Sequence, residues 1–289
     1  MKPFDYIQPR DLAEAASAWA AYGASARLLA GGTDMMVALR HGAVEADMVI
    51  DLKQVTELGG PIAIHNETLR VPATATMTAL RDYLAAHGLF PALQDAAAVV
   101  GSIQIRNRAT LAGNICNASP AADTVPVLAS LNASVEIYGP NGPRQRPVAG
   151  FIQGNRQIDL APGELVTAVL IPLPKGPHGC AFDRITRRRG VDLATTNMAC
   201  SIPHDGAVTI AFGAVSPKPL VLRDETGLLG DPAASAQDRA PVLRDLAAHA
   251  TPITDVRANA DYRRAMLCVM AERALGVAHA RLAAGGGHA

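Results

Sequence analysis

The chain of 289 residues is long enough for two domains, and its 49% hydrophobic and 18% charged residues are typical of a soluble globular protein. Lys plus Arg and Asp plus Glu each number 26, so the net charge is zero, which argues against a nucleic-acid partner. No stretch approaches the roughly 20 apolar residues of a membrane span, and no secretion signal opens the sequence, so we expect a cytoplasmic protein.

Helical and strand periodicities alternate through the first part of the chain. Apolar residues at helical spacing after Pro9 predict a helix that ends near Gly23, and the next apolar run predicts a strand at 27–30. The same patterns predict, in chain order, a helix at 35–40, strands at 48–52, 62–64 and 69–71, helices at 77–87 and 91–100, a helix that passes into a strand over 128–138, and a strand at 165–173.

Proline and glycine interrupt residues 175–179, and no periodic pattern crosses this segment. We therefore predict two domains, at 1–175 and 176–289. Beyond the boundary, the patterns predict three antiparallel strands at 181–187, 194–202 and 207–215, followed by helices near 238–249 and 259–283. Strands and helices that are segregated in this way favour an α+β fold.

The first candidate site is a glycine turn within residues 28–35. A strand leads into Gly31-Gly32, and a helix begins directly afterwards, so backbone N–H groups can converge without obstruction by Cβ atoms. Such a turn suits a pyrophosphate. The alternative is an ordinary strand–helix connection in which Thr33 or Asp34 is the N-cap. The turn is not a dinucleotide fingerprint, because no G-x-G-x-x-G is present.

The second candidate site is the segment from Thr110 to Asp123, which places many hydrogen-bonding groups among small residues. A ligand can approach the backbone of such a loop closely. The alternative is that Asp123 simply caps the following helix and leaves Pro126 in its first turn, where the missing N–H is harmless. Two loops of this kind in one chain favour a bound anionic ligand.

Other reactive residues do not form a recognisable site in the sequence. The four cysteines are far apart and the eight histidines are scattered, which argues against a metal ion or an iron–sulfur cluster held by this chain. Cys116 lies inside the second motif, where a buried thiol is favoured over a redox-active one. The run 187–189 of three arginines is interpreted as a solvated or interface patch.

The two motifs carry a family resemblance. AGGTD at 30–34 and GSIQIRNRATLAGNICNASPAAD at 101–123 closely resemble the FAD-binding medium subunit of the xanthine dehydrogenase and carbon monoxide dehydrogenase family of molybdenum hydroxylases. FDYIQPRDLAEA at 4–15 and FDRITRRRGVDLATTNMA at 182–199 extend the resemblance over nearly the whole chain. It implies a PCMH-type FAD-binding domain of two α+β subdomains, followed by a smaller C-terminal domain.

The resemblance also implies which residues contact FAD. In this numbering they are Leu28, Leu29, Ala30, Gly31, Gly32, Thr33, Asp34, Met35, Val100, Thr110, Ala112, Gly113, Asn114, Asp123, Val166 and Arg184. Val166 corresponds to an aliphatic residue over the flavin ring, and Arg184 to a basic residue at the domain junction. Ala112 stands where relatives have glycine, which is tolerated only if residue 112 does not need a positive φ. Thr33 stands where several relatives have histidine, which favours noncovalent FAD.

The implied function is electron transfer. A large molybdenum-cofactor subunit would oxidise the substrate, a small subunit would pass the electrons through two 2Fe–2S clusters, and the FAD of this chain would deliver them to NAD, a quinone or another acceptor. A dimer of such heterotrimers is implied, with no catalytic residue and no metal ligand in this chain. Two alternatives stay open: a self-sufficient PCMH-fold flavin oxidoreductase, and a scaffold subunit that has lost FAD.

Overall fold

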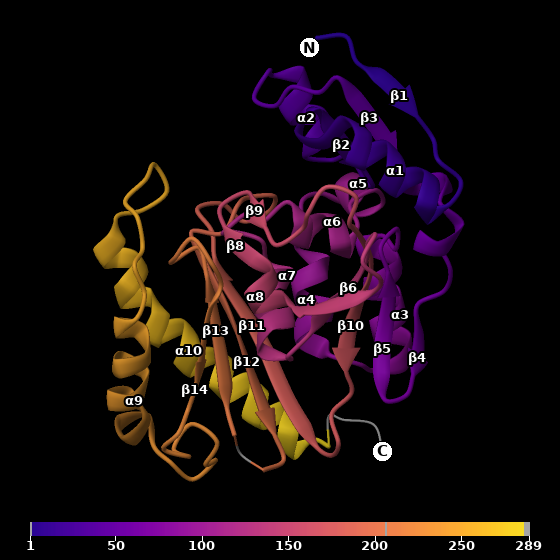
Figure 1. The fold of residues 1–289 in the computed structure, drawn as a ribbon. Coiled ribbons are helices and arrows are strands. Elements are labelled where there is room, and N and C mark those ends of the chain that lie inside the picture. Colours follow the sequence, from indigo (N-terminus) through magenta and orange to yellow (C-terminus); the bar gives the residue numbers. More distant parts are fainter. Residues whose placement is uncertain (1, 206, 286–289) are drawn as a thin grey trace.

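The computed structural model describes residues 2–205 and 207–285 of the chain. A small subdomain at the N-terminus sits on top of the rest of the molecule (Figure 1). It contains a parallel sheet of order β1-β3-β2, built from β1 (Asp5–Ile7), β2 (Ala26–Leu29) and β3 (Met48–Asp51), together with α1 (Leu12–Tyr22) and α2 (Met35–Arg40).

Strand β3 explains how this small subdomain is held together. Met48 and Ile50 belong to the large core that also includes residues of α1, whereas Val49 packs with Leu39 of α2 in a separate cluster. Successive side chains of a strand point to opposite faces, so a strand covered on both faces reads as a continuous apolar run. This is why MVI at 48–50 lacks any polar alternation.

The second subdomain is built on an antiparallel sheet of order β4-β5-β10-β6-β7. Its strands are β4 (Ala63–His65), β5 (Thr68–Pro72), β6 (Ser134–Tyr138), β7 (Arg144–Pro147) and β10 (Leu165–Pro172). The chain between β5 and β6 forms α3 (Met77–His87), α4 (Pro91–Ala98), α5 (Ile103–Arg106), α6 (Leu111–Cys116) and α7 (Thr124–Ser130), while α8 (Val148–Phe151) and the hairpin of β8 (Ile152–Gly154) and β9 (Gln157–Ile158) precede β10.

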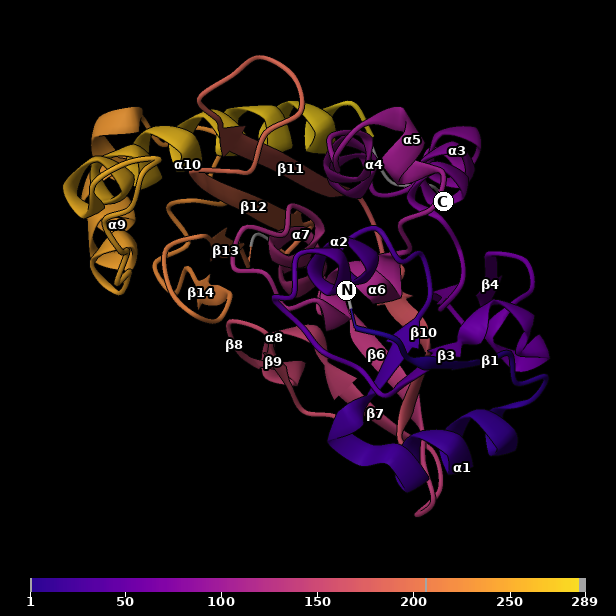
Figure 2. The ribbon, with the colours of Figure 1, turned by 90° about the horizontal axis from the view of Figure 1, so that it is seen from above.

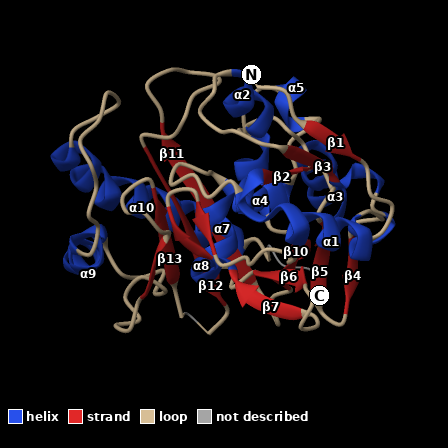
Figure 3. Cartoon of the chain, turned by 45° about the horizontal axis from the view of Figure 1, so that its top comes forward, coloured by secondary structure: helices blue, strands red, loops and turns tan. Residues whose placement is uncertain are grey.

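The C-terminal part contains an antiparallel sheet of order β11-β12-β13-β14. Its elements are β11 (His178–Ile185), β12 (Thr196–Pro203), β13 (Thr209–Gly213), β14 (Leu220–Arg223), α9 (Ala236–Ala248) and α10 (Ala260–Ala283). Helix α10 lies along one face of the sheet and α7 lies on the other (Figures 2 and 3). Both faces are therefore buried, and α7 joins this sheet to the core of the second subdomain.

The α+β class is confirmed, and the predicted helices at 35–40 and 77–87 have the observed bounds. The prediction of three strands in the C-terminal sheet was wrong, because β14 adds a fourth along β13. Leu220–Arg223 follows Ser-Pro-Lys-Pro and has only four residues, so local pattern does not distinguish it from a loop. Over residues 2–205 and 207–285, no helix is both long and apolar enough to cross a bilayer.

Candidate functional site

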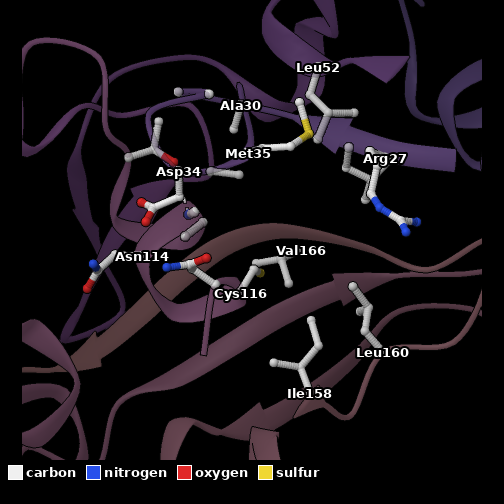
Figure 4. Close-up of a pocket in the computed structure, with 18 of the residues that line it drawn as sticks. Arg27, Ala30, Asp34, Met35, Leu52, Asn114, Cys116, Ile158, Leu160 and Val166 are labelled. Atoms are coloured by element: carbon white, nitrogen blue, oxygen red, sulfur yellow. Dashed lines mark hydrogen bonds between the residues drawn. The ribbon is translucent and has the colours of Figure 1, made fainter. Parts of the chain in front are cut away.

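A cavity of about 610 Å³ opens between the N-terminal subdomain and the second subdomain. Figure 4 shows Ala30, Asp34 and Met35 on one wall, and Asn114 and Val166 on the other. The volume lies within the range of about 300–1,000 Å³ that is usual for cofactor and ligand pockets. The site therefore draws its walls from segments that are far apart in the sequence.

The loop after β2 depends on both of its glycines. A Cβ atom on Gly31 would lie 2.2 Å from the carbonyl oxygen of Arg108, so this position touches the backbone that precedes the second motif. Gly32 has a φ of +74°, a conformation that glycine adopts at no steric cost. One glycine permits the contact between the two motifs, and the other permits the turn.

Asp34 stands at the N-cap position of α2 but does not act as a side-chain cap. Its side chain accepts no hydrogen bond from the helix, and it lies on the cavity wall. Thr33 also lines the cavity. The interpretation of this turn as an ordinary capped connection is therefore not what the geometry shows.

The second motif is held by its own side chains. Thr110 caps α6, because its Oγ1 accepts a hydrogen bond from the Gly113 N–H at 3.0 Å. Thr124 Oγ1 donates to Asn114 Oδ1 at 2.7 Å, which fixes the Asn114 amide at the cavity wall. Ala112 is buried within α6 and has no positive φ, so the condition under which its methyl group is tolerated is met.

The charges at the cavity favour an anion. Among the described residues that line it, Arg27 and Arg156 are the cations and Asp34 is the carboxylate. Arg156 sits at the tip of the β8–β9 hairpin, where its backbone N–H donates to the Ala118 oxygen at 3.0 Å and its guanidinium donates to Asn117 Oδ1. The hairpin is thereby tied to the second motif.

The remaining lining is mostly apolar. The large side chains that face the cavity are Trp19, Leu28, Met35, Leu52, Val100, Ile105, Ile158, Leu160, Leu165 and Val166. Apolar walls together with the two arginines suit a ligand that combines aromatic rings with a charged group.

Most of the residues predicted from the sequence meet at this cavity. Those that line it are Leu28, Ala30, Gly31, Gly32, Thr33, Asp34, Met35, Val100, Thr110, Ala112, Gly113, Asn114 and Val166. Leu29, Asp123 and Arg184 are not among the lining residues. Leu29 packs with Leu39 and Val49 instead, so its side chain belongs to the small core of the N-terminal subdomain.

Asp123 and Arg184 form a buried ion pair of 2.8 Å at the domain junction. Asn197 Nδ2 donates to the other carboxylate oxygen of Asp123 at 3.0 Å. Burial raises the pKa of Asp123, while the hydrogen bonds from Asn197 and Arg184 and the charge of Arg184 act in the opposite direction. Asp123 makes no side-chain cap bond to α7, and contact of this pair with a cofactor stays a prediction.

Several residues of the cavity lie outside the residues and segments that were predicted from the sequence. They include Trp19, Arg27, Leu52, Ile105, Arg156, Ile158, Leu160 and Leu165. Cys116 and Asn117 belong to the predicted segment 110–123 but were not among the predicted cofactor contacts. Trp19 and Leu52 follow ordinary core patterns, and only the fold brings them to the cavity. The β8–β9 hairpin is too short to carry a strand signal, so nothing local marked Arg156.

Cys116 lies on the cavity wall as a protonated thiol. Burial raises its pKa to about 12, so the thiolate does not form near neutral pH. The residue is therefore a small apolar contact. Within the described residues, no group of three or more His, Cys, Asp and Glu side chains is placed to hold a metal ion.

Comparisons with known proteins agree in both parts of the chain. Residues 2–174 match the family described as "FAD binding domain in molybdopterin dehydrogenase", and residues 181–278 match "CO dehydrogenase flavoprotein C-terminal domain". The carbon monoxide dehydrogenase medium chain of Afipia carboxidovorans is 32% identical, with 96% of this chain and 97% of that protein covered.

Two further relatives extend the comparison. The xanthine dehydrogenase FAD-binding subunit of Escherichia coli is 29% identical, with 90% of each chain covered. A solved chain of carbon monoxide dehydrogenase from Hydrogenophaga pseudoflava superposes with a TM-score of 0.88 at 28% identity, covering 97% of this chain and 99% of that one. The chain thus spans at least 90% of the length of each of these relatives.

Proposed function

Because this chain belongs to the family of FAD-binding subunits of molybdopterin dehydrogenases, we propose that it is the electron-transfer subunit of a heterotrimeric molybdenum hydroxylase. In this proposal its FAD takes electrons from the 2Fe–2S clusters of a small partner subunit and passes them to NAD, a quinone or another acceptor. The substrate is oxidised on a large molybdopterin-binding partner.

The observation that carries the proposal is the meeting of the two glycine loops at one cavity. FAD combines two ring systems with a doubly charged pyrophosphate. The cavity combines peptide groups of both loops and two arginines with apolar walls. A Cβ atom on Gly31 would lie 2.2 Å from the Arg108 oxygen, so the close approach of the two loops depends on glycine. The arginines suit the pyrophosphate and the apolar walls suit the rings, so the residues present fit this cofactor.

Each group of residues has a distinct task in this proposal. The backbone of residues 31–34 and the start of α6 receive the pyrophosphate, and Arg27 and Arg156 offset its charge. Val166, Met35 and Leu52 exclude water from the rings. Thr33 offers no imidazole for a covalent bond, so FAD is held noncovalently. Bound flavin supplies chemistry that accepts and releases electrons singly or in pairs.

Partners and compartment belong to the same proposal. The relatives are named as a medium chain and as an FAD-binding subunit, which implies further subunits. We propose a large molybdopterin-binding subunit, a small 2Fe–2S subunit and a dimer of these heterotrimers. The thiols of Cys116, Cys180, Cys200 and Cys268 are free, which supports a cytoplasmic complex in a reducing compartment.

The test is expression of the chain alone and together with the two partner subunits. We expect a flavin spectrum in both preparations, release of FAD on denaturation, and substrate-dependent bleaching of the flavin only in the complex. Absence of flavin from both would favour the scaffold alternative and overturn the proposal. Flavin that is reduced by substrate without partners would favour a self-sufficient oxidoreductase.

A further inference from the structure

A short turn at one edge of the cavity is held by two arginines from different parts of the chain. The turn, residues 99–101, follows the end of α4, and its Val100 side chain lines the cavity. Arg106 Nη1 donates to the carbonyl oxygens of Val100 at 3.3 Å and Gly101 at 2.9 Å. Arg184 Nη1 donates to the carbonyl oxygen of Val99 at 3.4 Å. Three consecutive carbonyls thus accept from guanidinium groups.

The conformation of this turn explains why it needs such support. The last carbonyls of a helix have no partner within the helix, and cations near a helix C-terminus are stabilising. Gly101 has a φ of +52°, and a Cβ atom there would lie 2.7 Å from Ile105 Cγ2. The turn is therefore tight, and the two arginines supply the hydrogen bonds that hold it.

Arg184 reaches this turn from the C-terminal sheet, on β11. It is kept there by the 2.8 Å ion pair with Asp123, in which the side chains of Arg184 and Asp123 are only 13% and 8% exposed. Asn197 of β12 donates to the same carboxylate. Gly213 leaves room for Asn197, since a Cβ atom at residue 213 would lie 2.2 Å from Asn197 Oδ1. The position of Arg184 is thus set by residues of both domains.

We infer that Arg184 is a positioning residue of the FAD site, which holds the 99–101 turn and so sets the place of Val100 in the cavity wall. Asp123 is the anion that keeps Arg184 in position. This inference rests on the proposed function. It differs from a direct contact between Arg184 and the cofactor, because Arg184 acts through Val100. It also assigns the C-terminal domain a part in shaping the flavin site.

The chain offers a matched control in a second ion pair, which links α10 to α4, the helix that precedes the 99–101 turn. Arg281 of α10 pairs with Asp95 of α4 at 2.9 Å and donates to the Cys180 oxygen at 2.8 Å. Neither Arg281 nor Asp95 lines the cavity. Arg281→Gln therefore removes a link between the C-terminal part and α4 without touching the 99–101 turn.

The experiment compares full-length wild type, Arg184→Gln, Asp123→Asn and Arg281→Gln by FAD titration with flavin fluorescence, visible circular dichroism and melting of the apoprotein. We expect Arg184→Gln to raise the Kd for FAD about tenfold and Asp123→Asn about threefold, with an altered visible dichroism, while Arg281→Gln leaves both unchanged. Equal Kd values for Arg184→Gln and Arg281→Gln would overturn the inference. Should Arg184→Gln not fold, the comparison of Asp123→Asn with Arg281→Gln decides in the same way.

A double-mutant cycle with Val100→Ala separates positioning from direct contact. If Arg184 acts through Val100, Arg184→Gln adds little to the loss that Val100→Ala already causes. Additive losses would show a direct contact and would overturn the inference. Failure of the wild type itself to bind FAD would instead overturn the proposed function, so the two failures are distinguishable.

Discussion

The two glycine loops reach the same cavity but are organised in opposite ways. The loop at 30–34 is shaped by its backbone: Gly31 passes close to the Arg108 oxygen, Gly32 adopts a positive φ, and Asp34 makes no cap bond. The loop at 110–117 is shaped by side chains, because Thr110 Oγ1 accepts from the Gly113 N–H and Asn114 Oδ1 accepts from Thr124 Oγ1. The comparison teaches that polar side chains on one cavity wall can be left without a capping bond in one loop and serve as structural caps in the next.

Gly31→Ala tests whether the first loop depends on its backbone, and it should have the largest effect: we expect FAD binding to weaken about a hundredfold. The new Cβ atom would lie 2.2 Å from the Arg108 oxygen, so the two loops must separate. Overpacking of this kind also costs about 1–3 kcal/mol of stability. Flavin titration and thermal melting measure both effects. Retention of wild-type affinity would show that contact between the loops is not required.

Gly32→Ala should weaken FAD binding about tenfold, with a stability cost of about 1–2 kcal/mol for the left-handed backbone. Gly42→Ala is the control for the left-handed backbone, since Gly42 has a φ of +70° and nothing within 4 Å of its Cβ position, whereas a Cβ atom on Gly32 would also lie 2.6 Å from Leu29 Cδ1, the end of a flexible side chain. Gly42 does not line the cavity. Both variants should melt at lower temperature, and only Gly32→Ala should lose flavin. Equal flavin binding by the two would mean that residue 32 is an ordinary turn.

Thr110→Val tests whether the polar side chains of the second loop are structural. The substitution removes the cap of α6, which costs about 1 kcal/mol of stability. We expect FAD affinity to fall only about threefold, because the hydroxyl group is engaged in the cap. Ser235→Ala removes the cap of α9 in the C-terminal part and should lower stability alone. A loss of affinity as large as that of Gly32→Ala would contradict the structural role given to Thr110.

The smallest expected effect concerns Cys116 and the pH dependence of the free energy of unfolding. Its pKa is raised by burial from 9.0 to about 12, so the folded protein keeps the proton while an unfolded chain loses it above about pH 9. The folded state binds more protons in that range, and this thiol therefore lowers stability as pH rises from about 9 to 12. At pH 8 iodoacetamide should react more slowly with Cys116 in the folded apoprotein than in the urea-unfolded chain, as followed by mass spectrometry, because the half-buried thiol stays protonated. Equal labelling rates in the two states would contradict the raised pKa.

Local signals predicted much of the fold and the two loops, and long-range contacts account for what was missed. The helices at 35–40 and 77–87 follow from periodicity, and the second is also bounded by the Thr76 cap and by Gly88 in the left-handed conformation. The approach of Gly31 to Arg108, the reach of Arg156 to Asn117 and the pairing of Asp123 with Arg184 join residues that are distant in the chain. No window of sequence contains both partners of these contacts.

Strand β10 has a consequence for how the protein is made. It is the central strand of its sheet, between β5 and β6, and Leu165 and Val166 at its start line the cavity. During translation, β5 and the helices α3 to α7 are synthesised before β10. The sheet can form completely, and Leu165 and Val166 can line the cavity, only after residues 165–172 have left the ribosomal exit tunnel. The cofactor can therefore bind only after nearly the whole first domain has been synthesised.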